Sequence, residues 1–306
     1  MDARDEKGSK VAAVVLTHDA PRSFERCVRA LAAQTIPLTA LLVTDNASAE
    51  PVEHVVESFP GAVVQRLPVN TGPAGGYAAA LTAFLASDAE WAWVMDDDCV
   101  PEPHALEMQL AAASPTRVVL PMAWSDDSYE GTRSHGWLGA LIHRSVVERV
   151  GVPKAELFWW TEDTEYLQWR IPEAGFEVVW TDEAVTRVSR ARADDTKPAW
   201  KYYYEARNQV YHRLYVQRPA RSPRTRPTPH HLQVSVRCWR AARSVVLLTG
   251  RVALREHHDR SHKLVSIARG ALDGLRGKLG ATVMPDSSHR PSISEADARD
   301  PERRPG

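Results

Sequence analysis

Short apolar runs alternate with helix-favouring segments through the first hundred residues of this chain. Four runs have the length and composition of buried strands: 11–16, 40–43, 62–67 and 91–95. Three segments between them have helical spacing or small, helix-forming residues: 21–34, 52–58 and 77–85. This alternation predicts right-handed crossovers, and therefore an α/β fold with a mostly parallel sheet and helices on both faces.

Polar residues follow each predicted strand where it ends. They are Thr17 and His18, Asp45 and Asn46, the stretch 70–76, and Asp96, Asp97 and Asp98. Ligands of such sheets bind beyond the carboxyl ends of the strands, so the four sets are expected to meet in one crevice. The first strand leads into Thr-His-Asp-Ala-Pro, without the glycine pattern of a dinucleotide-binding turn, and the chain contains no P-loop motif.

Two of these strand ends have a distinct chemistry. Asp96, Asp97 and Asp98 crowd three like charges before Pro101, and a hard cation bound through oxygen is their natural partner. The alternative is a solvated acidic turn. Glycines at 72, 75 and 76 allow a backbone to approach a ligand closely or a helix to start tightly.

A second acidic stretch lies further along the chain. Glu162, Asp163 and Glu165 follow Trp159 and Trp160, a setting that can raise a carboxylate pKa and offer a flat face to a sugar. An acidic helix N-terminus, stabilised by the helix dipole, would explain the same acids without catalysis.

Composition indicates a globular protein of one large or two small domains, with 306 residues, 43% hydrophobic and 25% charged. The three cysteines, Cys27, Cys99 and Cys238, form neither a disulfide framework nor a zinc pattern, which favours a reducing compartment. Residues 1–10 are polar, expected to be flexible, and lack the apolar core of a signal peptide. No apolar stretch reaches the roughly 18 residues of a membrane span, so a cytoplasmic location is expected.

Charge is distributed unevenly. Residues 217–280 contain 14 Lys and Arg against 3 Asp and Glu, a net +11 that leaves −12 for the rest of a chain whose total is −1. We expect a linker at 217–230, a basic helical extension at 231–280 with an amphipathic helix pair in 231–254, and a disordered tail at 281–306. The extension suits an anionic membrane surface, at the inner face of the membrane, or is an ordinary helical cap with a solvated basic face. No module for nucleic-acid binding is present.

The strand-end set VVLTHDAP, LLVTDNAS, NTGPAGGY and WVMDDDCVP resembles the nucleotide-sugar half of family 2 inverting glycosyltransferases. The resemblance extends from about residue 11 to about residue 214. Within the family, the motifs are most similar to those of actinobacterial galactofuranosyl- and rhamnosyltransferases. It implies a GT-A catalytic domain at 11–216, with a donor half at 11–100 and an acceptor half at 101–216.

This resemblance implies a role for each strand-end residue. Thr17, His18, Asp45 and Asn46 would line the pocket of the nucleotide base. Asn70, Gly72, Gly75 and Gly76 would border the ribose and the donor sugar. Asp96 and Asp98 would hold Mg²⁺ or Mn²⁺ against the diphosphate, and Asp97 would face the sugar.

The acidic stretch matches the family pattern whose second acid is the base, here Asp163, with Glu162 as its nearest rival. Glu165 would anchor the helix or the acceptor. Predicted acceptor contacts are Trp137, with weaker support for His135, and the pair Trp159 and Trp160. The tyrosines Tyr202 and Tyr204 would stack on sugars or belong to a half-buried helix.

The pattern departs from the family at Arg187, where relatives usually place a metal-binding histidine. An arginine cannot ligate a metal, but it could clamp a phosphate, as could Arg207, with Asn208 near the diphosphate or the acceptor loop. The implied function is inverting transfer from a UDP-galactofuranose or dTDP-rhamnose type of donor to a glycan or lipid-linked acceptor. The alternative, for which Arg187 is the best support, is a non-catalytic nucleotide-sugar- or glycan-binding protein of the same fold.

Overall fold

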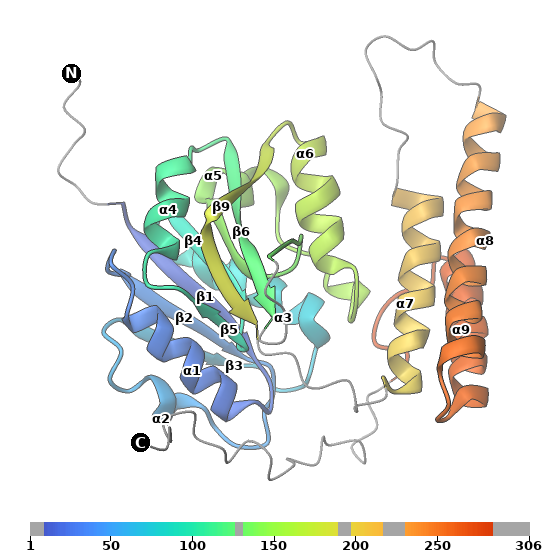
Figure 1. Cartoon of the computed structure of the whole chain (residues 1–306), viewed down its shortest axis with the longest axis horizontal. Helices are drawn as coiled ribbons and strands as arrows, with labels where there is room; N and C mark the ends of the chain where they lie inside the picture. Colours follow the sequence, from blue (N-terminus) through green and yellow to red (C-terminus); the bar gives the residue numbers. More distant parts are fainter. Residues whose placement is uncertain (1–8, 126–130, 189–196, 217–229, 284–306) are drawn as a thin grey trace, which may run out of the picture.

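A computed structural model describes residues 9–125, 131–188, 197–216 and 230–283, and side chains from residue 234 onward in the last range. Most of the predicted N-terminal arm, linker and C-terminal tail lies outside the described residues. Figure 1 shows an α/β body beside a separate stack of three helices.

The donor half is a parallel sheet built as the sequence predicts. Its strands, β1 (Val11–Thr17), β2 (Ala40–Asp45), β3 (Ala62–Arg66) and β4 (Trp91–Asp96), pair in the order β3-β2-β1-β4. β1 is central and wholly buried, which explains its continuous run of apolar residues. This order carries all four strand ends to the same edge of the sheet.

The second half of the sheet mixes directions. β8 (Leu138–His143) pairs antiparallel with β4, and the order continues through β6 (Arg117–Ser125), β9 (Glu177–Val188) and β5 (Cys99–Pro101). β6 and β9 are parallel, β5 is antiparallel to β9, and β7 (Thr132–Arg133) pairs with β6. Nine strands of the described residues thus form one sheet.

Helices cover both faces, as predicted. On one face α1 (Pro21–Ala32), α2 (Glu53–Val56) and α4 (Ala105–Ala112) pack against the side chains of Val11, Ala13 and Val15. The opposite face, with Ala12, Val14 and Leu16, is covered by α3 (Gly72–Ala86), α5 (Arg144–Val150), the π-helical η2 (Thr164–Arg170) and α6 (Ile171–Glu173). The alternation of neighbouring β1 residues between two cores is the period of a strand buried on both sides.

One helix begins earlier than expected. The sequence predicts a glycine turn followed by a helix from residue 77, but α3 already starts at Gly72, with proline in its first turn. Proline is compatible with the first turn because no intrahelical partner exists there for its missing N–H. The glycine-rich stretch is therefore the N-terminus of α3.

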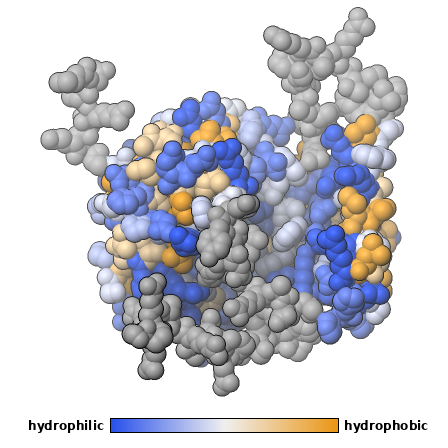
Figure 2. All heavy atoms as spheres, viewed as in Figure 1, coloured by the Kyte–Doolittle hydropathy of each residue, from blue (hydrophilic) through white to orange (hydrophobic). Residues whose placement is uncertain are grey.

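The C-terminal helical extension is present, and α7 (Ala199–Tyr211) packs with it. α7 runs into η3 (His212–Val216) and contacts α8 (His230–Arg255) and α9 (Arg260–Leu275) through a small apolar core of Tyr202, Ala206, Leu248, Val252 and Ile267. The prediction of a helix pair at 231–254 is wrong, because α8 is one continuous helix over that range. None of the described helices is long and apolar enough to cross a membrane. Apolar side chains nevertheless gather on the outer edge formed by α8, at the right of Figure 2.

The close packing of α9 on α7 depends on Gly270, where an added Cβ would lie 2.2 Å from the carbonyl oxygen of Tyr203. We expect Gly270→Ala to lower the free energy of unfolding by about 1–3 kcal/mol, because the backbones of both helices would have to separate. Gly250→Ala is the matched control: its Cβ meets nothing within 4 Å, so the loss of backbone entropy in the unfolded chain should leave stability unchanged or raised. Chemical denaturation measures both, and equal stability of the two variants would contradict the prediction.

Candidate functional site

The register of the parallel strands brings the predicted donor residues together. Thr17 of β1 lies opposite Asp45 of β2, and Leu16 lies opposite Asp96 of β4. These residues therefore lie side by side where the three strands end, which is the edge at which open α/β sheets bind ligands.

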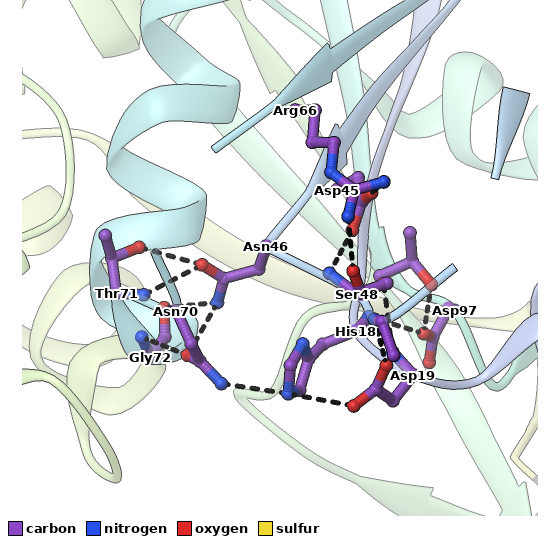
Figure 3. A network of polar contacts seen from close by, with 12 residues as sticks. His18, Asp19, Asp45, Asn46, Ser48, Arg66, Asn70, Thr71, Gly72 and Asp97 are labelled. Carbon is purple, nitrogen blue, oxygen red and sulfur yellow. Dashed lines mark hydrogen bonds and ion pairs between the residues drawn. The ribbon is translucent and has the colours of Figure 1, made fainter. Parts of the chain in front are cut away.

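Asp97 is bound from the end of β1. The hydroxyl of Thr17 donates to Asp97 Oδ2 at 2.6 Å, and the backbone N–H of His18 donates to the same oxygen at 3.3 Å (Figure 3). Burial nevertheless raises the pKa of Asp97 to about 7, with the charge of Asp98 adding to the effect and the Thr17 bond opposing it. This carboxyl group thus titrates near neutral pH.

Asn46 organises the glycine turn from the end of β2. Its amide donates to the Asn70 side chain and to the carbonyl of Gly72, and its Oδ1 accepts from the backbone and hydroxyl of Thr71 (Figure 3). Asn70 in turn meets the ring of His18 at 2.9 Å. Asn46 is 3% exposed and therefore shapes the pocket through the turn it holds.

Asp45 is fully buried beneath this network. Its Oδ1 accepts the backbone N–H of Ser48 at 2.8 Å, and its Oδ2, which has no hydrogen-bond partner, lies 3.6 Å from the guanidinium of Arg66. The carboxylate fixes the turn that follows β2. The expected contact of Asp45 with a nucleotide base stays a prediction.

The glycines of the turn permit close packing of backbone. Gly72 has a φ of +68°, and a Cβ there would lie 2.0 Å from the carbonyl oxygen of Phe158. Gly76 lies against Leu16, and its added Cβ would be 2.4 Å from that side chain. The start of α3 therefore packs closely between the end of β1 and the loop before the second acidic stretch.

Asp96 is held by a residue for which the sequence analysis gave no role. The hydroxyl of Tyr77 donates to Asp96 Oδ1 at 2.5 Å, and the Tyr77 ring stacks on Trp137 with centroids 4.5 Å apart. The only sequence signal for Tyr77 is its place directly after the two glycines. Burial raises the pKa of Asp96 well above its ordinary value, as do the charges of Asp98, Asp97 and Asp163, while the Tyr77 bond lowers it.

The loop before Glu162 has a strained backbone. Phe158, Trp160 and Thr161 have φ values of 60°, 71° and 69°, a region that costs non-glycine residues energy. The Asn208 amide compensates by donating to the carbonyls of Leu157, Trp159 and Trp160. Phe158 also accepts a hydrogen bond from the backbone N–H of Ala74, at the start of α3.

This loop presents Glu162 and Asp163 to the crevice. Burial raises the pKa of both carboxyl groups, and for Glu162 the charges of Asp163 and Asp96 add to it. Asp163 Oδ1 accepts the N–H of Thr164, while Oε2 of Glu162 is buried without a partner. Because Asp163 also raises the pKa of Asp96, the two acidic stretches meet across one site.

Several predicted contacts are wrong because the residues are buried. Trp137 is 2% exposed between Tyr77 and Tyr166, so it has no free face for a sugar. Tyr202 and Tyr204 are likewise fully buried, in a helix that is more deeply enclosed than the half-buried one expected. Glu165 is 1% exposed and paired with Lys154 and Arg170, which makes it the anchor of its helix and not an acceptor contact.

The prediction that Arg207 binds a phosphate is also wrong. It is fully buried, and its guanidinium donates to the carbonyls of Glu156, Leu157 and Gly280. Arg187 remains half exposed on β9 opposite Val100, where it pairs with Glu102 at 2.6 Å. Its role toward a phosphate stays a prediction.

Of the two tryptophans before the acids, Trp160 is the accessible one, at 43% exposure. The ammonium of Lys197 lies over its ring at 4.5 Å. Trp159 packs edge-on against Trp200 and lies under Lys201. Trp160 is therefore the more accessible of the two, and the contact of either with an acceptor stays a prediction.

The profile of glycosyl transferase family 2 matches residues 12–172, which include both acidic stretches, Asp96–Asp98 and Glu162–Asp163. The chain belongs to this family. Among curated relatives, the galactofuranosyltransferase GlfT1 of Mycobacterium tuberculosis is 30% identical over 185 residues. That alignment covers 48% of this chain and 60% of the relative's length.

Solved structures agree with this membership at the level of the fold. A mannosyltransferase of Pyrobaculum calidifontis, in complex with GDP-Man and Mn²⁺, aligns with a TM-score of 0.55 at 17% identity over 90% of both chains. Residues 1–349 of S. aureus TarS, in complex with UDP-GlcNAc, align with a TM-score of 0.53 at 14% identity, covering 88% of this chain and 92% of that one. The GT-A fold expected for this family 2 member is confirmed.

The raised pKa of Asp97 generates a prediction about the free protein. A carboxyl whose folded pKa exceeds its unfolded value contributes stability that is present at low pH and lost as pH rises through about 7. We expect Asp97→Asn to be more stable than the wild type at pH 8, with a smaller difference at pH 5, because the amide can still accept from Thr17. Thermal melts at both pH values measure this. A variant less stable at pH 8 than the wild type would show that the ionised carboxylate is stabilised by something else.

Proposed function

We propose that this protein is a metal-assisted inverting glycosyltransferase that uses a nucleotide-diphospho-sugar. The observation that carries the proposal is the meeting of two carboxylate groups, Asp96–Asp98 at the end of β4 and Glu162–Asp163 after a strained loop, at the mouth of a nucleotide-sugar fold. One group suits the diphosphate end of a donor, and the other lies where an acceptor hydroxyl would arrive.

In this proposal Asp163 is the general base. It would take the proton of the acceptor hydroxyl as the hydroxyl oxygen attacks the anomeric carbon and the nucleoside diphosphate leaves from the opposite face. Its raised pKa suits this role, because a base with a pKa closer to the working pH is more effective. Glu162 is the alternative base. Its buried Oε2 has no hydrogen-bond partner and could likewise accept the proton.

The residues present fit a hard cation that shares its ligands with the substrate. Among the described residues no group of three or more Asp, Glu, His or Cys side chains is arranged to hold a metal ion. Asp96 and Asp98 supply carboxylate oxygens, and Mg²⁺ or Mn²⁺ commonly completes its coordination with phosphate oxygens and water. A cation held by Asp96 and Asp98 would supply positive charge opposite the diphosphate.

We propose a UDP-galactofuranose or dTDP-rhamnose type of donor. The 30% identical relative is named a galactofuranosyltransferase, which favours the first, and a role in cell-wall polysaccharide synthesis follows from that likeness. A glycan or a lipid-linked glycan would be the acceptor, with Trp160 beneath it. A lipid-linked acceptor would make contact of the basic extension with an anionic membrane surface useful, at the cytoplasmic face.

Asp163→Asn tests the assignment of the base. We expect sugar transfer to fall by roughly 10²–10⁴-fold, because an amide cannot accept the proton, while donor affinity is retained. Asp182→Asn, the same change at an exposed acid of β9 paired with Arg133, is the control and should keep full activity. Donor-binding calorimetry and a transfer assay with UDP-galactofuranose and dTDP-rhamnose measure the two properties. Unchanged transfer by Asp163→Asn, with loss in Glu162→Gln, would move the role to Glu162.

Asp98→Ala tests the metal assistance. We expect the variant to lose the difference between donor binding with Mn²⁺ and with EDTA, since one of two carboxylate ligands is gone. Isothermal titration of a UDP-sugar in each buffer gives the readout. Wild-type binding that is equally strong in EDTA would refute metal assistance, and wild-type binding without transfer to any acceptor would favour a binding protein.

A further inference from the structure

A groove lies away from the crevice, between α7, η3 and α8. It has a volume of about 530 Å³ and is lined by four arginines, Arg213, Arg240, Arg243 and Arg251, together with Glu205 and Trp239. None of these residues belongs to the nucleotide-sugar site.

The positive charge of this groove exceeds its negative charge. Glu205 is already paired with Lys197 and with Arg251, so these two cations compensate its negative charge. Burial lowers the pKa of Arg213, and the neighbouring charges of Arg240 and Arg243 lower it further. An arginine retains its charge under these conditions, so within the described residues the cations of the groove outnumber its acids and favour binding of an anion.

The same side of α8 exposes apolar side chains. Val236, Trp239, Val246, Leu247 and Leu254 are 45%, 64%, 67%, 56% and 82% exposed. With Arg243 among them, their spacing places them on one face of the helix, opposite the buried Leu248 and Val252 that pack on α7 and α9. α8 therefore has two apolar faces, of which one is inside the helical stack and one is outside (Figure 2).

We propose that this groove is a binding site for the phosphate of anionic lipid headgroups, which seats the outer face of α8 in the membrane interface. Guanidinium groups bind phosphate oxygens through paired N–H donors, and the exposed Trp239 and Leu247 would lie at the boundary between headgroups and acyl chains. This names the residues of the membrane contact on which the proposed lipid-linked acceptor depends.

A chain of contacts joins the groove to the acceptor side of the crevice. Glu205, in the groove wall, pairs with Lys197, and Lys197 lies over the ring of Trp160. Trp160 is separated from Glu162 by one residue. A membrane bound at the groove would thus lie on the side of the molecule where Trp160 is open to an acceptor.

The test is vesicle co-sedimentation of the full chain, without donor or acceptor, so that its outcome does not depend on glycosyl transfer. We expect binding to vesicles with 30% phosphatidylglycerol and little binding to pure phosphatidylcholine, with weakening at high salt. Arg240→Gln/Arg243→Gln should reduce the partition coefficient roughly thirtyfold, at about a factor of five for each charge.

The control is Arg255→Gln/Arg276→Gln, which removes the same charge from the same helical stack outside the groove. Both control residues are exposed, and Arg255 lies about 18 Å along α8 from Arg243. Trp239→Ser, which keeps the charge, should also weaken binding. Circular dichroism melts confirm that each variant is folded.

Equal loss in both double variants would overturn the site, because the effect would then be one of net charge. Equal binding of the wild type to neutral and anionic vesicles would overturn the phosphate assignment. Tight binding of inorganic pyrophosphate, lost in Arg240→Gln/Arg243→Gln, without binding to anionic vesicles would identify a site for a soluble phosphate and refute the lipid headgroup. None of these outcomes alters the result of the Asp163→Asn assay.

Discussion

Crowded carboxylates at the carboxyl ends of buried strands are the constraint on which the rest of the structure depends. Burial raises the pKa of Asp96, Asp97, Glu162 and Asp163, and repulsion by neighbouring carboxylates adds to it for Asp96, Asp97 and Glu162, so negative charge at this site is unfavourable in the free protein. Hydrogen bonds from Thr17, His18 and Tyr77 offset part of this cost. A cation bound there, as proposed, would relieve the remainder and would couple stability to occupancy of the site.

The acidic loop is held by buried polar side chains from a distant helix. Arg207 and Asn208 donate to the carbonyls of Glu156, Leu157, Trp159 and Trp160, in a loop where Phe158, Trp160 and Thr161 have positive φ angles. Such angles persist only where surrounding contacts determine them. The helix α7 is thus a structural part of the site, and its tyrosines Tyr202, Tyr203 and Tyr204 are buried.

The sequence predicts the parallel half of the sheet because β1 to β4 are apolar throughout and end in polar residues. It also predicts the meeting of Thr17, Asp45 and Asp96, which follows from strand order alone. It mispredicts Trp137, Arg207 and Glu165, because an aromatic or charged residue near a motif gives no sign of its burial. Tyr77 lacks a signal for the same reason: its bond to Asp96 depends on the rotation of α3. The sequence predicts two helices where the structure has the single helix α8, because the apolar residues of its two faces form two amphipathic patterns.

The loop that presents Asp163 is fastened to the far end of the described chain. Gly280 donates its N–H to the carbonyl of Glu156 and accepts from Arg207, while Tyr204 bonds to Val283. The contact between Gly280 and Glu156 joins residues 124 positions apart, and the other two join residues 73 and 79 positions apart. During synthesis the parallel strands β1 to β4 can therefore form long before the loop with the proposed base Asp163 is in place. If the proposed roles hold, a chain that has not yet added and docked α9 would lack the loop geometry that transfer requires.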